Sequence, residues 1–157
     1  MRPPRTYERG GRRALDQRWL EYVRTTGDTG DPQALAGSSG LAQGVREFNA
    51  GQYFESHETW ETAWRETPYP QCLVLLALTK AGAALAHLRQ GNAHGGRRLL
   101  RDALALLEAF PDYYAGLALG GLRRDLRRCM VQGTLAGPPP LLIARETGAP
   151  DKQENQE

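Results

Sequence analysis

The residue types best suited to chemistry lie between Phe48 and Arg65. This segment holds two of the three Trp residues and one of the three His residues of the 157-residue chain. On a helical wheel at about 100° per residue, one face collects these side chains: Tyr53, Phe54, His57, Trp60, Glu61 and Trp64. His57 and Glu61 are therefore two polar groups, one turn apart, on an aromatic stripe, with Glu58 at its edge. Because an unpartnered buried polar group is costly, the sequence predicts partners opposite this pair.

The segment 71–90 offers those partners. It is apolar almost all round, yet it carries Lys80 and His87 two turns apart on one stripe. Lys80 is the only lysine before the C-terminal tail, and a charge in an apolar run either reaches water or pairs with a carboxylate. We therefore expect His57 and Glu61 to face Lys80 and His87 across two helices, with Glu58 at the mouth.

One interpretation of this cluster is a structural network. Glu61 pairs either with Lys80 or with Arg65 one turn further on. His57 hydrogen-bonds either His87 or a backbone carbonyl. In this case the cluster joins the helices and does no chemistry.

A second interpretation is a metal site. His57 and Glu61 at i and i+4, with His87 as a third ligand, could hold Zn, Mn or Fe. Glu58 would then be the catalytic base of a metal-dependent hydrolase. Glu61 stands where the zinc-protease helix His-Glu-x-x-His has its second His, and Lys80 would repel a cation. Both features weigh against this interpretation.

A third interpretation is a pocket for a small anion. Lys80, a protonated His and the positive end of the helix that follows Asn92 would supply the attraction. Asn92 also suits a simple helix cap, and Trp60 and Trp64 are typical core residues. The residues alone leave the three interpretations open.

Helices must position these residues, and the sequence predicts an all-α fold. We expect a compact antiparallel bundle of about five helices over residues 38–136, because the connections are short and no strand pair shows an alternating pattern. The expected helices span residues 38–50, 53–66, 71–90, 93–110 and 117–132. Ser38 or Ser39 caps the first, Gly51 ends it in the left-handed conformation, and Asn92 caps the fourth.

Flexible arms are expected on both sides of the bundle. Residues 1–37 are predicted to form an Arg-rich arm with a short helix over 13–25 and a linker. Residues 137–157 are predicted to be a disordered tail. Trp19 and Tyr22 are expected to be exposed on the short helix, where they would favour a homodimer.

Composition and charge narrow the classes of protein. The chain has 40% hydrophobic and 24% charged residues and a net charge of +2, as in an ordinary soluble domain. Lys80 and His87 argue against a membrane span within residues 72–88. Two cysteines without framework spacing, and no apolar signal segment, predict a cytoplasmic protein.

Basic residues gather on one face of the last expected helix. They are Arg123, Arg124, Arg127 and Arg128. Because the net charge is small and no aromatic residues are interleaved, we expect a solvated face, and we do not expect nucleic-acid binding.

One long motif resembles a known family. The motif runs Phe48-Asn49-x-Gly51-x-Tyr53-Phe54-Glu55-x-His57-Glu58-x-x-Glu61-x-x-Trp64-Arg65 and continues as His87-x-x-x-Gly91-Asn92-x-x-Gly95. It is similar to the bacterial and archaeal family called domain of unknown function 309, over about residues 41–116. The resemblance implies a small all-helical, cytoplasmic domain with no established activity. It also implies that the family's polar positions correspond to His57, Glu58, Glu61, Trp64, His87 and Asn92.

The sequence therefore favours a non-enzymatic binding or structural domain. Its polar cluster, which either joins the helices or takes a small ligand, consists of His57, Glu58, Glu61, Trp64, Lys80, His87 and Asn92. The alternative is the metal-dependent hydrolase with ligands His57, Glu61 and His87.

Overall fold

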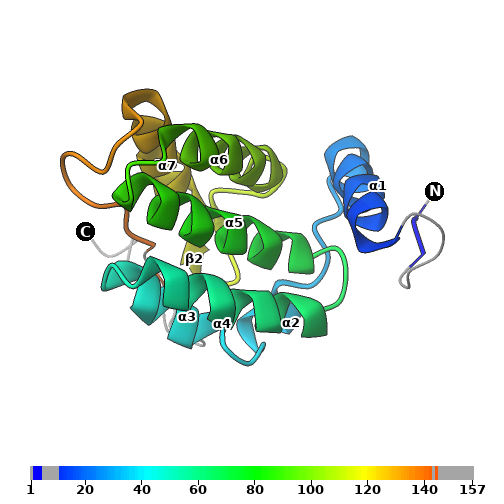
Figure 1. Cartoon of the computed structure of the whole chain (residues 1–157). Coiled ribbons are helices and arrows are strands. Elements are labelled where there is room, and N and C mark those ends of the chain that lie inside the picture. Colours follow the sequence, from blue (N-terminus) through cyan, green and yellow to red (C-terminus); the bar gives the residue numbers. More distant parts are fainter. Residues whose placement is uncertain (1, 5–10, 143, 145–157) are drawn as a thin grey trace, which may run out of the picture.

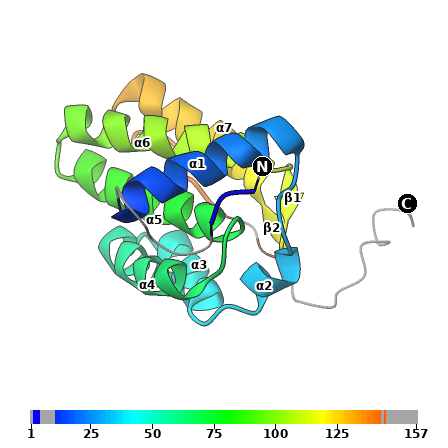
Figure 2. The ribbon, with the colours of Figure 1, turned by 90° about the vertical axis from the view of Figure 1, so that its right-hand side faces the viewer.

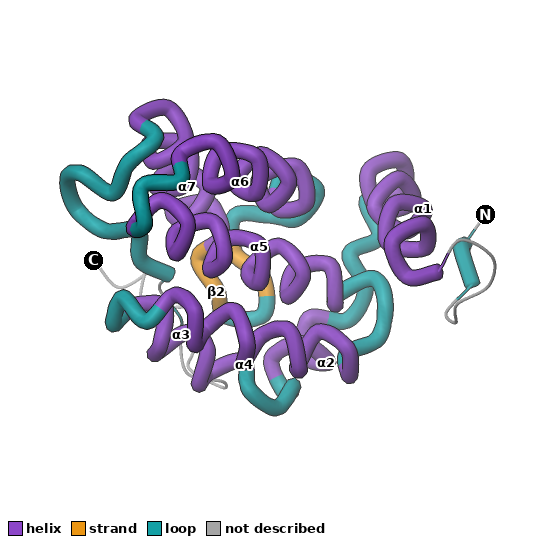
Figure 3. Tube along the Cα trace, viewed as in Figure 1, coloured by secondary structure: helices purple, strands orange, loops and turns teal. Residues whose placement is uncertain are grey.

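Helices dominate the computed structural model, which describes residues 2–4, 11–142 and 144 (Figures 1 and 3). They are α1 Gly11–Thr26, α2 Pro32–Ala36, α3 Leu41–Asn49, α4 Tyr53–Glu66, α5 Cys72–Arg89, α6 Ala93–Leu107 and α7 Leu119–Gln132. The all-α class predicted from the sequence is confirmed.

A small hairpin between α6 and α7 was not predicted. Its strands are β1 Tyr113–Tyr114 and β2 Leu117–Ala118, paired antiparallel. Ala115 and Gly116 connect them, with φ values of 55° and 81°. Two positive φ values in a two-residue loop are typical of a turn that matches the twist of paired strands. The expectation of no strand pair was wrong because two-residue strands are too short to show an alternating pattern.

The central helix is α5. It lies between α4 on one side and α6 on the other (Figure 1). Among the described residues it is the helix long and apolar enough to cross a membrane, but 67% of it is buried inside the bundle. This burial confirms the expectation of a core helix.

Close contact between α4 and α5 depends on Gly82. A Cβ atom at Gly82 would lie 2.9 Å from Ser56 Oγ and 3.1 Å from the Tyr53 carbonyl oxygen. The buried face of α4 accordingly consists of Tyr53, Ser56, Trp60 and Ala63. The predicted inward face was centred on His57. This prediction was wrong, because the buried face is rotated about the helix axis by part of a turn from His57. Phe54, which was placed on that face, is 62% exposed.

The helix ends follow local signals in most places. Gly51 adopts a φ of 80° after α3, and Asn92 Oδ1 accepts a hydrogen bond from the Gly95 amide at 3.1 Å, as predicted. The expected serine cap of α3 was wrong. The residue before Leu41 is Gly40, with a φ of 92° and no side-chain cap. The left-handed conformation of Gly40, which favours glycine, interrupts the backbone before Leu41. The helix α3 therefore begins later than a cap at Ser38 or Ser39 would place it.

The N-terminal helix α1 contributes to the bundle's core. Its buried face includes Leu15, Trp19, Leu20 and Val23, which belong to the same hydrophobic cluster as α5. Trp19 is 0% exposed and stacks on Tyr69, with ring centroids 5.4 Å apart. Figure 2 shows α1 lying across one side of the bundle. The expectation of an exposed Trp19 was wrong, because the apolar face of α1 packs against the turn after α4.

The described part of the C-terminal segment is also held in place. Leu142 is buried, and its backbone N–H and carbonyl both bond the Asn49 side-chain amide at 2.8 Å. Ala144 forms a β-bridge with Leu117. For these residues the expectation of disorder was wrong. The Asn49 amide both donates to and accepts from the Leu142 backbone, as a neighbouring strand would. The rest of that tail, residues 143 and 145–157, and residues 1 and 5–10 of the N-terminal arm lie outside the described residues.

Candidate functional site

The pair His57 and Glu61 lies at the edge of α4. Their side chains are 27% and 36% exposed, and His57 Nε2 is 4.0 Å from Glu61 Oε1. His57 Nδ1 lies 3.2 Å from the Thr79 carbonyl oxygen, and Arg65 donates to Glu61 Oε2 at 3.3 Å. Both polar groups thus have partners of the kind that the structural network predicts.

Lys80 and His87 face other directions. Lys80 Nζ lies 3.8 Å from Asp102 Oδ2 on α6, and His87 Nδ1 lies 3.0 Å from Asn92 Nδ2 at the turn after α5. Thr79 and Gly82 of α5 contact α4, and Lys80 lies about 100° around the helix from Thr79. The predicted four-residue cluster is therefore not assembled, because Lys80 lies on the α6 side of α5.

The predicted metal ligands are not brought together. Within residues 2–4, 11–142 and 144, no group of three or more His, Cys, Asp or Glu side chains could hold a metal ion. His87 bonds Asn92 and does not join His57 and Glu61. Glu58, the expected base, is exposed on the solvent side of α4. The described part of the chain therefore provides no ligand set of three such side chains for Zn, Mn or Fe.

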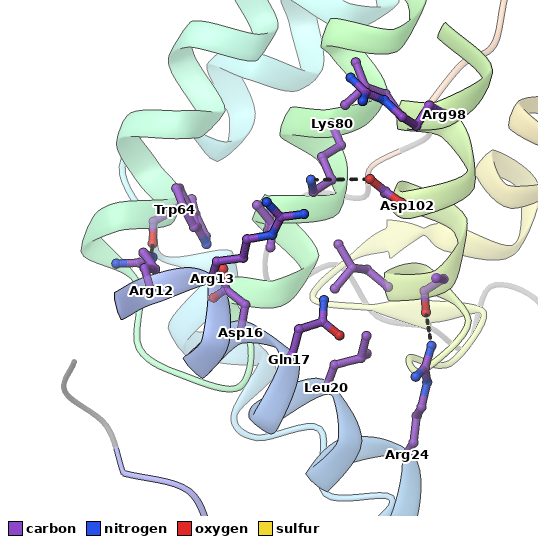
Figure 4. Close-up of a pocket in the computed structure, with 14 residues that line it drawn as sticks. Arg12, Arg13, Asp16, Gln17, Leu20, Arg24, Trp64, Lys80, Arg98 and Asp102 are labelled. Atoms are coloured by element: carbon purple, nitrogen blue, oxygen red, sulfur yellow. Dashed lines mark hydrogen bonds and ion pairs between the residues drawn. The ribbon is translucent and has the colours of Figure 1, made fainter. Parts of the chain in front are cut away.

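A pocket opens between α1, α5 and α6, with Trp64 of α4 at one end (Figure 4). Its volume is about 760 Å³, within the range of small-molecule sites. The lining consists of Arg12, Arg13, Asp16, Gln17, Leu20, Arg24, Trp64, Leu76, Lys80, Arg98, Leu99, Asp102, Ala105 and Leu106. Five of these side chains are cationic and two are carboxylic acids.

The cationic side chains of this pocket differ in their partners. Arg12 donates to the Trp64 carbonyl oxygen at 3.2 Å, and its guanidinium lies 4.1 Å from the Trp64 ring centroid. Arg24 donates to the Ala105 carbonyl oxygen at 3.4 Å, and Lys80 pairs with Asp102. Arg13 and Arg98 form no hydrogen bond or ion pair with any residue that the structure describes. These two guanidinium groups are thus available to a ligand.

Asp16 is a buried carboxyl group in the wall of the pocket. Tyr69 donates a hydrogen bond from its hydroxyl to Asp16 Oδ1 at 2.5 Å. Burial raises the pKa of Asp16, and this effect outweighs the Tyr69 hydrogen bond and the positive charges of Arg12 and Lys80, which lower the pKa. Asp16 therefore offsets the surrounding positive charge less effectively than an exposed carboxylate would.

Trp64 provides an unpartnered donor beside the pocket. The Trp64 ring nitrogen is buried and has no hydrogen-bond partner among the residues that the structure describes. The other two indoles are satisfied, because Trp19 donates to the Pro4 carbonyl at 2.9 Å and Trp60 to the Leu41 carbonyl at 3.3 Å. Trp64, one of the predicted site residues, is thus distinguished from the two core tryptophans.

Most of this pocket was missed from the sequence. Lys80 and Trp64 were predicted as site residues, whereas the arginines and Asp16 of α1 were assigned to an arm. Arg98 and Asp102 lie one turn apart on α6, a spacing that marks a shared face. No local pattern says that α1 packs beside that face.

The chain is similar to one described family and to a curated protein. Residues 41–99 match the family described as "Domain of unknown function (DUF309)". This segment is therefore similar to that family, which confirms the resemblance predicted from the sequence. An uncharacterized protein of Aquifex aeolicus (strain VF5) is 27% identical over 114 residues, which cover 68% of this chain and 34% of the relative. The chain thus spans about a third of that relative's length.

The family match covers only part of the pocket. The matched residues run from α3 into the first half of α6 and include Trp64, Lys80 and Arg98. Arg13 and Asp16 of α1, and Asp102 of α6, lie outside it. The pocket is thus formed jointly by the family segment and by flanking parts of this chain.

Proposed function

We propose that this protein is a non-enzymatic ligand-binding domain that holds a small organic anion in the pocket between α1, α5 and α6. The observation that supports the proposal is the charge of that pocket. Five cationic side chains meet two carboxylic acids there, an excess of three positive charges when both acids are ionised. Like charges held close together repel one another, and an anion between them removes that repulsion.

The partners of the cations support the same function. Arg13 of α1 points toward Lys80 in Figure 4, while the carboxylate nearest Lys80 belongs to Asp102 on its other side. A guanidinium with no protein partner is the group best suited to hold a carboxylate or phosphate by paired hydrogen bonds. Arg13 and Arg98 are two such groups on opposite helices, α1 and α6.

The polar residues of α4 have structural roles in this proposal. His57 joins α4 to α5 through the Thr79 carbonyl oxygen. Glu61 bonds Arg65 one turn further on and so supports the last turns of α4. Their partners agree with a domain that binds its ligand without transforming it.

We place the protein in the cytoplasm as part of this proposal. Its two cysteines, Cys72 and Cys129, are buried free thiols, which suits a reducing compartment. We also propose that α7 does not bind nucleic acid. Arg123 donates hydrogen bonds to the carbonyl oxygens of Leu107 and Phe110 and so stabilises the C-terminal end of α6.

A thermal-shift screen tests the anion site. Small organic anions and their neutral analogues are added to the wild-type protein, to the double variant Arg13→Ala/Arg98→Ala and to the control Arg124→Ala. A ligand at 100 times its Kd stabilises the folded state by about 2.7 kcal/mol, so anions should raise the Tm by several degrees. We expect this rise in the wild type and the control, a smaller one at high salt, and none in the double variant. Equal effects of neutral analogues would contradict the proposal.

A further inference from the structure

We infer that the anion is a small soluble phosphate monoester with an apolar organic part, an inference that rests on the proposed function. A carboxylate and a phosphate monoester both suit arginine, but they differ in charge, in shape and in the number of hydrogen bonds they accept. The pocket between α1, α5 and α6 favours the phosphate on each of these three counts.

The charge of the pocket exceeds what one carboxylate would balance. Its cationic side chains outnumber its carboxylic acids by three. Lys80 shares its charge with Asp102 at 3.8 Å, whereas Arg13 and Arg98 have no carboxylate partner among the residues that the structure describes. A phosphate monoester carries a charge of about −1.5 to −2 at neutral pH, so it matches these two guanidinium groups.

The cations also approach from different directions. Arg13 comes from α1, Lys80 from α5 and Arg98 from α6, so they surround a common space instead of lining one side of it. A planar carboxylate is satisfied by a single guanidinium in its own plane. A tetrahedral phosphate presents three terminal oxygens in different directions, so it can accept hydrogen bonds from all three helices.

Part of the remaining wall of the pocket is apolar. Leu20 of α1 and the α6 residues Leu99 and Leu106 lie along it. An inorganic phosphate ion would leave this surface in contact with water, whereas the organic part of a monoester covers it. This surface is the reason for inferring an ester and not the free ion.

The test compares probes that differ in one property at a time. Calorimetric titration measures the Kd of phenyl phosphate, phenyl sulfate, benzoate, inorganic phosphate and phenol at pH 7.5. Phenyl sulfate has the tetrahedral shape of phenyl phosphate with one negative charge fewer. Each other probe lacks part of the charge, the tetrahedral shape or the apolar part that this pocket matches. Because losing a charged hydrogen bond or an apolar contact weakens binding, we expect phenyl phosphate to bind about tenfold more tightly than each other probe. This preference should fall to about threefold or less in Arg98→Gln and persist in the control Arg124→Gln.

The outcomes separate the two claims. Equal affinity for phenyl phosphate, phenyl sulfate and benzoate would overturn the phosphate inference and leave the anion-binding function intact. If none of the anions binds more tightly than phenol does, both the phosphate inference and the anion-binding function are overturned. Co-sedimentation with phosphatidic acid vesicles, without binding of phenyl phosphate, would place the phosphate on a lipid and overturn the soluble ester. A tenfold preference that Arg98→Gln leaves unchanged would place the phosphate elsewhere and overturn the site.

Discussion

The buried carboxyl group of Asp16 shows how competing effects are decided at a single residue. Tyr69, Arg12 and Lys80 all favour its charged form, but burial opposes that form and prevails, so the pKa is raised above the ordinary 3.8. A group whose pKa is raised by folding binds protons more tightly in the folded state. Its contribution to stability is therefore present below its ordinary pKa and is lost as the pH rises through the raised value.

Asp16→Asn tests this sign. Asparagine keeps an acceptor for the Tyr69 hydroxyl but cannot ionise. The stability of the variant relative to the wild type should therefore increase as the pH rises from about 3 to about 7. Urea unfolding at several pH values measures the difference. A difference that falls with pH would mean that Arg12 and Lys80 outweigh burial.

Lys80 shows what a sequence can and cannot predict about one residue. A lone lysine in an apolar helix predicts either a side chain that reaches water or a carboxylate partner, and the structure supplies a partner in Asp102. The helical wheel placed Lys80 opposite Glu61 instead, because a wheel gives angles about one axis and does not say which neighbour lies on which side. That information comes from the packing at Gly82, which places α4 against a different face of α5.

At the scale of helices, the close approach of α4 to α5 depends on Gly82. Gly82→Ala would place a methyl group 2.9 Å from Ser56 Oγ and 3.1 Å from the Tyr53 carbonyl oxygen. Because backbone cannot move aside as a side chain can, we expect a loss of about 1–3 kcal/mol in the free energy of unfolding.

The matched control is Gly121→Ala in α7. Its nearest contact would be Arg124 Nη2 at 3.7 Å, so the new methyl group meets no obstacle. Because alanine favours the helix over glycine, this variant should gain up to about 1 kcal/mol. Urea denaturation of both variants gives the comparison, and an equal response would show that α4 and α5 are not in close contact.

Helix boundaries were predicted within a few residues because their signals are local. Gly51 ends α3 through its own left-handed backbone conformation. Asn92 caps α6 by accepting a hydrogen bond from the Gly95 amide in the first turn of that helix. The β1–β2 hairpin and the tether between Asn49 and Leu142 were missed. The strands of the hairpin are too short to show an alternating pattern. The tether joins residues too far apart in sequence for any periodic pattern to reveal it.

The place of α1 determines whether the whole molecule has a pocket. Trp19 anchors α1 through the Tyr69 ring and is fully buried. We expect Trp19→Ala to lower the free energy of unfolding by about 3–5 kcal/mol. Phe54→Ala, which removes an exposed aromatic ring, should change it by about 0.5 kcal/mol or less. A small effect for Trp19→Ala in urea denaturation would show that α1 is not part of the core.

The docking of α1 is also the part of the fold that the sequence predicted least well. The sequence predicted a short helix over residues 13–25 and a linker after it. Nothing local says where the apolar face of this helix, with Leu15, Trp19 and Val23, packs. The anion site shares this dependence, since Arg13 reaches the pocket only when α1 is docked.

The most direct test of the anion site uses the three indole N–H groups as reporters in an NMR titration with phenyl phosphate. The Trp64 N–H lies beside the pocket without a partner, whereas those of Trp19 and Trp60 bond the Pro4 and Leu41 carbonyls. We predict a saturable shift of the Trp64 indole resonance, small changes for the other two, and loss of the Trp64 shift in Arg13→Ala/Arg98→Ala. An unchanged Trp64 resonance at a saturating concentration, or equal shifts of all three, would contradict binding in this pocket.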